Sequence, residues 1–313
     1  MTGAQRDRPR QVGVRVPSTG AQFLLESDGQ RAVVTEVGAT LRSWRVDERE
    51  QLDSFEIDEV GEGFRGKLLA PWPNRIRDSR YRFEGAEHRV AISEPERGNA
   101  LHGLVMWANW HPLRHASDEV VLGYRLHPQP GYPFTLELEV AYRLTPGGLD
   151  VTLRATNRGD APAPFGAGFH PYLTLAGTRL EDALLELPAR TRVPVDERLL
   201  PTGAPVPVEG TEHDFRRLRP LGPLALDTCF GDLERGADGL ARATLVAGGR
   251  RAVSVWMDER FHFIHVFTSR AGVAIEPMTC APDAFNSGDG LLALVPGASF
   301  AGRWGLNTQR EVQ

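Results

Sequence analysis

Apolar and polar residues alternate along several stretches of this chain, so that every second side chain is apolar. The alternation is seen in residues 136–144, 149–155 and 251–256, and more loosely in residues 31–37. A period of two with one polar face is typical of antiparallel strands that are buried on one side. No stretch keeps the period of a helix, although a short helix is expected around Asp182 or Phe215. The pattern therefore predicts an all-β protein.

Glycine and proline residues mark the turns between these stretches. Turn signals occur at residues 146–148, 157–160 and 247–249, and residues 81–92 have the pattern of a hairpin that turns near Gly85. Many short strands joined by such turns indicate one large antiparallel β-sandwich. We expect the domain to run from residue 14 to 307, with flexible termini at residues 1–13 and 308–313.

The composition narrows the classes of function. The chain has 313 residues, of which 41% are hydrophobic and 25% are charged, as in globular proteins. Its net charge of −5 argues against a nucleic-acid partner, because such a partner needs a basic face. Neither a secretory leader nor an apolar run long enough to span a membrane is found. We therefore expect a cytoplasmic protein without a membrane or nucleic-acid partner.

Residues suited to disulfide, metal or Schiff-base chemistry are scarce. Cys229 and Cys280 are too few for a disulfide framework or a zinc cluster. Lys67 is the only lysine, and it lies in a polar stretch that gives it no evident reason to be reactive. His262 and His265 fall in an apolar run expected to be a strand, where residues three apart point to opposite faces. We expect no metal and no cofactor.

One segment places a carboxylate where its position is fixed. Glu276 ends an apolar run and is followed by Pro277, which lacks a backbone donor and keeps the preceding residue extended. A carboxylate held on a stiff backbone suits a general base, whose geometry must be fixed. A glutamate at the surface end of a strand is the ordinary alternative.

A second segment, residues 70–77, combines an aromatic ring with polar side chains. Two prolines bracket Trp72, and Asn74 and Arg75 follow. A tryptophan ring can stack on a sugar, and Asn and Arg side chains bind hydroxyl groups. A surface loop anchored by a buried Trp72 is the alternative.

Two histidines and an aspartate complete the candidates. His102 lies between small and apolar residues before Gly103, where a structural histidine is the more common outcome. His170 precedes Pro171, and its ordinary pKa near neutrality makes it a candidate general acid, with a structural role as the alternative. Asp227 lies in an apolar frame and needs a partner or a ligand, or else caps a turn.

Taken in chain order, these segments resemble the aldose 1-epimerase (galactose mutarotase) family. The matching pieces are residues 73–76 (PNRI), 99–103 (NALHG) and 170–172 (HPY), Asp227, residues 276–277 (EP) and residues 282–286 (PDAFN). The resemblance extends from about residue 20 to residue 306. It implies the large antiparallel sandwich of that family, the galactose mutarotase-like supersandwich. It also implies the interconversion of the α and β anomers of a free sugar without a cofactor.

The resemblance further implies a role for each residue. Glu276 resembles the base that takes the proton of the anomeric hydroxyl, and His170 resembles the acid that protonates the ring oxygen. His102, Arg75 and Asp227 resemble the residues that hold the substrate, and His102 is also a candidate for sharing the delivery of the proton. Asn74 and Trp72 are expected beside them as further contacts to the sugar.

Three points stay open. The substrate is a neutral hexose or an anionic sugar, either sulfonated or 6-phosphorylated, for which Arg77 is a candidate contact. The protein is a mutarotase, a non-catalytic sugar-binding protein on the same fold, or a glycosidase that uses Asp227 and Glu276 as its carboxylate pair. It is expected to be a monomer or a homodimer.

Overall fold

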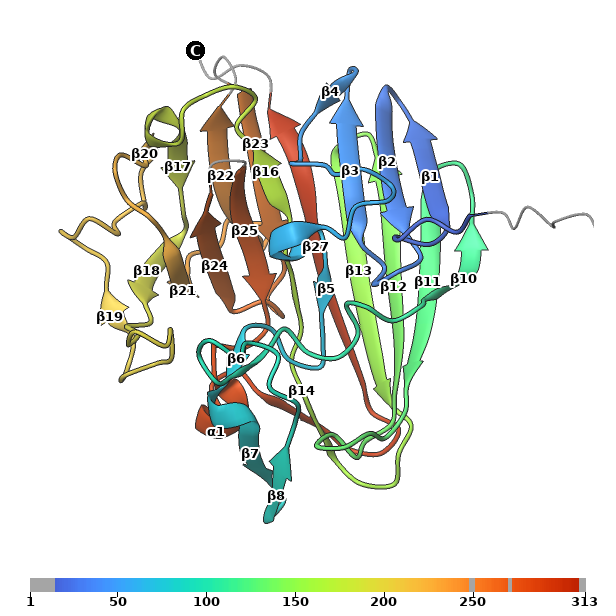
Figure 1. The fold of residues 1–313 in the computed structure, drawn as a ribbon. Helices are drawn as coiled ribbons and strands as arrows, with labels where there is room; N and C mark the ends of the chain where they lie inside the picture. Colours follow the sequence, from blue (N-terminus) through green and yellow to red (C-terminus); the bar gives the residue numbers. More distant parts are fainter. Residues whose placement is uncertain (1–14, 248–250, 270–271, 310–313) are drawn as a thin grey trace, which may run out of the picture.

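The computed structural model describes residues 15–247, 251–269 and 272–309 of the chain (Figure 1). The flexible N-terminus expected up to residue 13 and the last four residues lie outside this part. Strand β27 (Ser299–Gln309) continues past the predicted end of the domain, because Thr308 pairs with Val253 and Gln309 pairs with Ala252. Strand β27 thus includes Thr308 and Gln309, two residues beyond the domain end predicted at residue 307.

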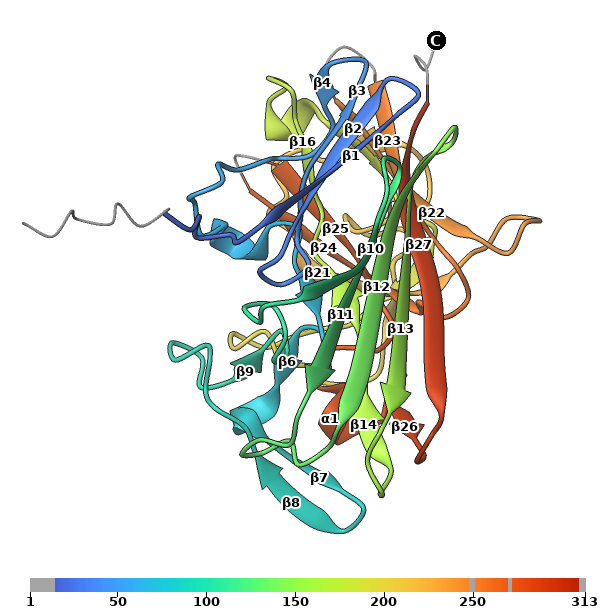
Figure 2. The ribbon, with the colours of Figure 1, turned by 90° about the vertical axis from the view of Figure 1, so that its right-hand side faces the viewer.

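One layer of the molecule is a nine-stranded antiparallel sheet. Its strands, in spatial order, are β10 (His111–His115), β11 (Glu119–Leu126), β12 (Leu136–Thr145), β13 (Gly148–Asn157), β27, β23 (Arg251–Met257), β22 (Ala241–Ala247), β17 (Leu184–Glu186) and β20 (Arg219–Pro220). Figure 2 shows β11, β12, β13 and β27 side by side along one side of the molecule. Buried and partly exposed side chains alternate along β12, as the sequence pattern predicts, because one face of this sheet covers the core.

The second layer consists of two sheets that lie in front of the nine-stranded sheet in Figure 1. The smaller sheet contains β1 (Gln22–Ser27), β2 (Gln30–Thr35), β3 (Leu41–Val46) and β4 (Arg49–Glu50). The larger, eight-stranded sheet contains β19 (Val206–Pro207), β18 (Ala189–Arg192), β21 (Asp227–Leu233), β24 (Phe263–Thr268), β25 (Gly272–Met278), β15 (Gly168–Phe169), β5 (Leu68–Leu69) and β16 (Tyr172–Thr174), which pairs with β25. The predicted antiparallel β-sandwich is confirmed.

Short elements complete the fold. Three two-stranded ribbons pair β6 (Arg75–Ile76) with β9 (Ala100–Leu101), β7 (Arg80–Phe83) with β8 (Ala86–Arg89), and β14 (Ala163–Phe165) with β26 (Leu292–Leu294). The β7–β8 ribbon is the hairpin predicted near Gly85. The helical turns are η1 (Glu62–Phe64), η2 (Arg77–Ser79), η3 (Leu180–Asp182) and α1 (Ala284–Ser287). The helix expected near Asp182 is thus one 3-10 turn, Phe215 lies outside any helix, and α1 was not predicted.

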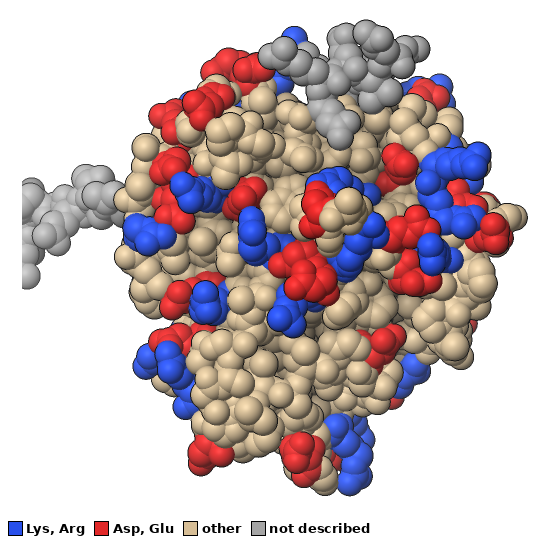
Figure 3. All heavy atoms as spheres, turned by 180° about the vertical axis from the view of Figure 1, so that it is seen from behind, with Lys and Arg blue, Asp and Glu red and all other residues tan. Residues whose placement is uncertain are grey.

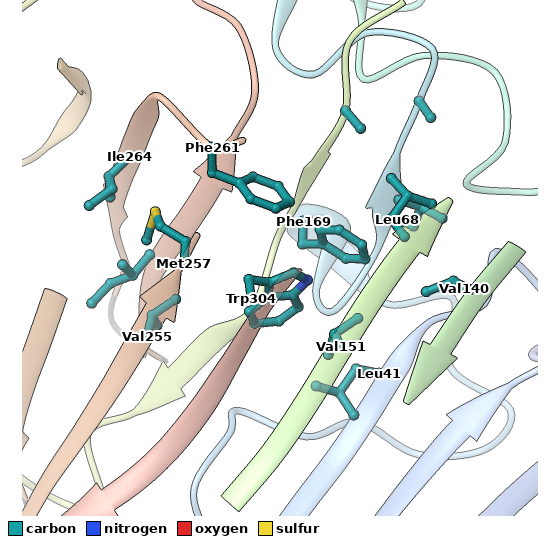
Figure 4. Close-up of a cluster of buried hydrophobic side chains, with 14 of the residues drawn as sticks. Leu41, Leu68, Val140, Val151, Phe169, Val255, Met257, Phe261, Ile264 and Trp304 are labelled. Atoms are coloured by element: carbon teal, nitrogen blue, oxygen red, sulfur yellow. The ribbon is translucent and has the colours of Figure 1, made fainter. Parts of the chain in front are cut away.

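Side chains from both layers form one hydrophobic cluster, part of which is drawn in Figure 4. The ring of Phe169 in β15 packs on Trp304 of β27, with the ring centroids 4.9 Å apart. Successive side chains along a strand point to opposite faces. Burying Phe169 between the layers therefore turns the next residue, His170, to the outer face of the eight-stranded sheet.

The face behind the nine-stranded sheet carries acidic and basic side chains mixed together, with no large area of one sign (Figure 3). Some of them form ion pairs across strands, such as Arg125 with Glu137 and Arg303 with Asp150. Within the described part of the chain, no helix is long and apolar enough to cross a membrane.

Candidate active site

An open cavity of about 120 Å³ lies on the outer face of the eight-stranded sheet. Strands of that sheet and the loops before β5 and around β6 and β9 supply its lining: Gly63, Phe64, Asn74, Arg75, Leu101, His102, His170, Tyr172, Asp227, His265, Phe267 and Glu276. Six of the seven residues that the sequence singles out as site residues lie here, although they come from widely separated parts of the chain.

Glu276 lies on β25, near the middle of the sheet. Its neighbour Ile275 is buried in the core cluster, so the alternation along the strand directs Glu276 into the cavity. Only 1% of the residue is exposed. Burial and the negative charge of Asp227 raise the pKa of Glu276 well above its usual value, although Arg75 acts in the opposite direction.

His170 contacts Glu276 directly, with 3.2 Å between its Nε2 and Glu276 Oε1. Burial and the charge of His265 lower the pKa of His170 below its usual value. The ring of Tyr172 stacks on the imidazole, with centroids 5.1 Å apart and planes 12° apart. His170 Nδ1 and Glu276 Oε2 are buried and have no hydrogen-bond partner, so both atoms are available to form hydrogen bonds with a ligand.

A glycine allows this approach of β15 to the neighbouring loop. A Cβ atom at Gly168 would lie only 2.9 Å from Pro73 Cβ. Glycine permits such a close backbone approach because it has no Cβ atom.

His102 faces His170 across the cavity, with ring centroids 5.4 Å apart, and Phe64 packs edge-on against it. Its Nδ1 accepts a hydrogen bond of 3.2 Å from the backbone N–H of Asn74, which leaves Nε2 as the protonated nitrogen of the neutral ring. Burial and the charge of His170 lower the pKa of His102 well below its usual value. His102 is therefore held as a neutral hydrogen-bond donor toward the cavity.

Asn74 and Arg75 enter the site together at the start of β6. The backbone N–H of Arg75 donates to Asn74 Oδ1 at 3.0 Å, which turns the Nδ2 end of the amide toward His265. The guanidinium of Arg75 lies against Glu94, a buried carboxylate behind the cavity wall, with Nη2 2.8 Å from Oε1.

Asp227 is paired with His265, which the sequence analysis considered only as a metal ligand. His265 Nε2 lies 2.8 Å from Asp227 Oδ1, and Asn74 Nδ2 lies 3.4 Å from His265 Nδ1. The amide orientation makes Nδ1 the acceptor and Nε2–H the donor to Asp227. Burial alone would raise the pKa of Asp227, but the bond and charge of His265 bring it below its usual value.

His262 and His265 were expected to point to opposite faces of a strand. Of the two, only His265 is among the described residues that line the cavity. A histidine inside an otherwise apolar strand is itself a sign of function, and this sign could have identified His265 from the sequence.

The position of Trp72 contradicts the prediction that its ring stacks on a sugar. It does not line the cavity and is only 2% exposed. Its ring packs on Phe285, with centroids 5.5 Å apart, and lies near Tyr132. The alternative of a loop anchored by a buried tryptophan is the one that the structure shows. Phe64 and Phe267 are the phenylalanines at the cavity instead.

Two other basic residues lie away from the cavity lining. Arg77 donates to Asp283 and to the carbonyl of Pro201. Lys67 lies in a polar stretch of sequence but is only 3% exposed, with its ammonium 4.2 Å from the centre of the Trp107 ring. Burial lowers the pKa of Lys67 to about 8. The polar sequence around Lys67 therefore does not describe its surroundings, which are buried. Lys67 is nevertheless not among the residues that line the cavity.

The described residues contain no group of three or more His, Cys, Asp or Glu side chains placed to hold a metal ion. Cys229 and Cys280 are both buried as free thiols. Burial raises the pKa of each thiol.

Comparison with known proteins places this chain in a family. Residues 21–306 match the family model described as aldose 1-epimerase. The chain is 33% identical to the uncharacterized protein YihR of Escherichia coli K12 over 284 residues, which are 89% of this chain and 90% of that protein. It is 32% identical to human galactose mutarotase over 232 residues, which are 68% of this chain and 66% of that protein.

Solved structures share the fold at lower sequence identity. A GalM/aldose epimerase homologue from C. elegans superposes with a TM-score of 0.84 at 22% identity, covering 93% of this chain and 99% of that one. A galactose 1-epimerase from Lactobacillus acidophilus gives 0.78 at 22% identity, with 92% and 94% covered. From the family model and the relatives at 32–33% identity, the chain belongs to the aldose 1-epimerase family.

Proposed function

We propose that this protein is a mutarotase, which interconverts the α and β anomers of a free hexose. The observation that carries the proposal is the 3.2 Å contact between Glu276 Oε1 and His170 Nε2 at an open cavity. The family supports it, as does the similarity to human galactose mutarotase.

The chemistry requires two proton transfers in opposite directions. The cyclic sugar carries a hydroxyl oxygen and the ring oxygen on the same carbon, C1. Opening the ring takes a proton from the hydroxyl and gives one to the ring oxygen. A base and an acid that lie 3.2 Å apart can serve two oxygens that share one carbon.

The steps balance without any other group. Glu276 accepts the proton of the anomeric hydroxyl while His170 donates a proton to the ring oxygen, and the C1–O5 bond breaks to give the open aldehyde. Rotation about C1–C2 presents the other face of the aldehyde to O5. The O5 hydroxyl then attacks C1 and returns its proton to His170, while Glu276 returns its proton to the carbonyl oxygen.

The environment of the pair suits this exchange. The raised pKa of Glu276 and the lowered pKa of His170 both favour the uncharged forms in the free cavity. The one titratable proton that the two side chains share is then on the Glu276 carboxyl. The reactive form, with an ionised Glu276 and a protonated His170, contains the same number of protons. Binding of the sugar hydroxyls therefore needs only to move one proton within the pair, with none taken from or released to water.

The other polar groups at the cavity are suited to hold the sugar. Asp227 accepts hydrogen bonds, while Arg75, Asn74 and His102 donate them. Asp227 keeps 30% of its side chain exposed and uses only one oxygen for His265, so its second oxygen is available to a hydroxyl group. We assign these four residues to substrate binding, with His102 also close enough to His170 to support proton delivery.

The test is the rate at which freshly dissolved α-glucose and α-galactose reach anomeric equilibrium, followed by polarimetry or proton NMR. The wild type should accelerate at least one of them. Glu276→Gln should lower kcat by roughly 10²–10⁴-fold, since an amide of the same shape is not a base. His170→Asn should lower kcat in the same range because it removes the acid.

Methyl glycosides provide the control, because a blocked anomeric oxygen has no proton to give. They should remain unchanged; cleavage would move the assignment to a glycosidase. Sugar binding to the wild type without any acceleration would instead identify a non-catalytic sugar-binding protein.

A further inference from the structure

Glu94 is a buried carboxylate that takes no part in the chemistry above, and only 3% of it is exposed. It receives hydrogen bonds from Arg75 Nε to both of its oxygens, at 3.2 and 3.0 Å, and from Arg75 Nη2 to Oε1 at 2.8 Å. Asn99 Nδ2 and Arg97 Nη1 each add a bond of 3.1 Å. These contacts fix Glu94 directly behind the cavity wall.

The backbone also holds Glu94 in place. Its carbonyl accepts hydrogen bonds from the N–H groups of Arg97, Gly98 and Asn99, and its own N–H donates to the Asn99 carbonyl. Burial alone would raise the pKa of Glu94, but the bonds and charge of Arg75, with the bond from Asn99, bring it below its usual value. Glu94 is therefore a charged carboxylate at neutral pH.

The pairing of Arg75 with Glu94 determines the net positive charge at the cavity. Arg75 is the only arginine or lysine among the described residues that line the cavity, and its charge is matched by Glu94 at contact distance. His102 and His170 have lowered pKa values and add no positive charge in the free cavity. Asp227 adds a negative charge, and Arg77 is engaged by Asp283 away from the lining.

We propose that Glu94 determines substrate class by holding Arg75 and cancelling its charge, so that the cavity selects uncharged sugars over sugars that carry a phosphate or sulfonate. The proposal rests on the proposed mutarotase function. Arg75 Nη1 lies 3.4 Å from Asn74 Oδ1, a weak contact, so it can still donate to a neutral hydroxyl. An anionic substituent would meet the negative charge of Asp227, while Arg75, the one arginine or lysine among the described lining residues, is already paired with Glu94.

The test compares glucose with glucose 6-phosphate as substrates at low ionic strength. The wild type should show a kcat/KM for glucose at least about tenfold above that for the 6-phosphate. Glu94→Gln keeps the shape but removes the charge, and it should shift this ratio toward the 6-phosphate by about tenfold or more. Glu94→Asp keeps the charge and should keep the preference for glucose.

Glu137→Gln is the matched control, because Glu137 also pairs with two arginines, Arg125 and Arg158, but on the nine-stranded sheet. It should leave the ratio unchanged. A loss of packing alone would lower both kcat/KM values together, so the ratio separates a specificity role from a structural one. A wild type that prefers the 6-phosphate, or an unchanged ratio in Glu94→Gln, would overturn the proposal.

Titration with inorganic phosphate tests the role of Glu94 separately from the proposed mutarotase activity. Calorimetry should detect no binding of phosphate to the wild type and clear binding to Glu94→Gln. In the double variant that combines Glu94→Gln with Arg75→Ala, phosphate binding should be lost. This readout does not need turnover, so it tests Glu94 even if no sugar is a substrate. Equal phosphate binding by the wild type and Glu94→Gln would contradict the role given to Glu94.

Discussion

Glu276 and His170 show how strongly the surroundings of a single residue set its chemistry. Each lies almost without exposed surface at the same cavity, and each is shifted toward its uncharged form. Neither pKa shift can be read from the local sequence, because its main cause is burial by the folded layers, and the charges that add to it, those of Asp227 and His265, come from other strands. The raised pKa of Glu276 has a consequence for the stability of the whole protein.

We predict that Glu276→Gln stabilises the protein at neutral and alkaline pH. A raised folded-state pKa means that the folded protein binds a proton which the unfolded chain has released, so the stability of the wild type falls as pH rises from the unfolded pKa through the folded one. Each unit of the shift is worth about 1.4 kcal/mol. The difference in Tm between variant and wild type should grow with pH over that window and vanish near pH 4.

Thermal unfolding followed by circular dichroism across pH 4–9 measures this. The partly exposed Glu137, whose pKa is lowered by hydrogen bonds from Arg125 and Arg158, serves as control. Glu137→Gln should give no stabilisation that grows with pH. A difference for Glu276→Gln that is constant across the range would mean that Glu276 is not held in its uncharged form.

Strand register is what brings the polar residues together at the scale of elements. His265 on β24 lies directly opposite Glu276 on β25, and Cys229 of β21 lies opposite His265 on the other side. Asp227, two residues before Cys229, is then within reach of the His265 ring on the same face. A shift of either strand by one residue would turn these side chains into the core.

We predict that His265 acts by positioning Asp227, so that its loss is felt in substrate binding. Glutamine can donate to Asp227 with its amide N–H and accept from Asn74 with its oxygen, whereas leucine can do neither. His265→Leu should raise KM by about tenfold or more with a smaller loss in kcat, because a charged acceptor loses its aligned bond. His265→Gln should restore most of the affinity. Equal KM values for the two variants would contradict this role.

The whole molecule decides which residues are available to a ligand. The sandwich core fixes Phe169 between the layers and thereby places His170 outside it. The same packing removes Trp72 from the cavity, since its ring fills space beside Phe285 and Tyr132. Trp72 thus contributes to stability in the way of other core aromatics.

We predict that Trp72→Ala lowers the free energy of unfolding by about 3–5 kcal/mol, the usual cost of truncating a buried aromatic residue. Trp72→Phe, which keeps most of the packing, should leave KM for the sugar within about twofold of the wild type. Denaturant unfolding and steady-state kinetics measure the two effects. Phe267→Leu offers the contrast, because Phe267 lines the cavity and its loss should raise KM. A large rise in KM for Trp72→Phe would return Trp72 to the site.

The sequence by itself determined the class of fold and most of the site. The period-two alternation and turn residues specify antiparallel strands because both are local properties of the chain. Glu276 before Pro277 and His170 after Gly168 are also marked locally, by residues that stiffen the backbone or allow close packing. Six of the seven candidate residues were found in this way and line the cavity.

Only the tertiary structure decided the partners of these residues. His265 lies 191 residues from Asn74 in the chain, and Glu94 lies 19 residues from Arg75, yet each pair is in contact. Nothing in the flanking sequence of Glu94 distinguishes a functional residue from an ordinary one, and the apolar strand around His265 does not reveal which residues the histidine contacts. Burial, charge compensation and pKa depend on which groups meet in space, and the packing of the two layers sets those meetings.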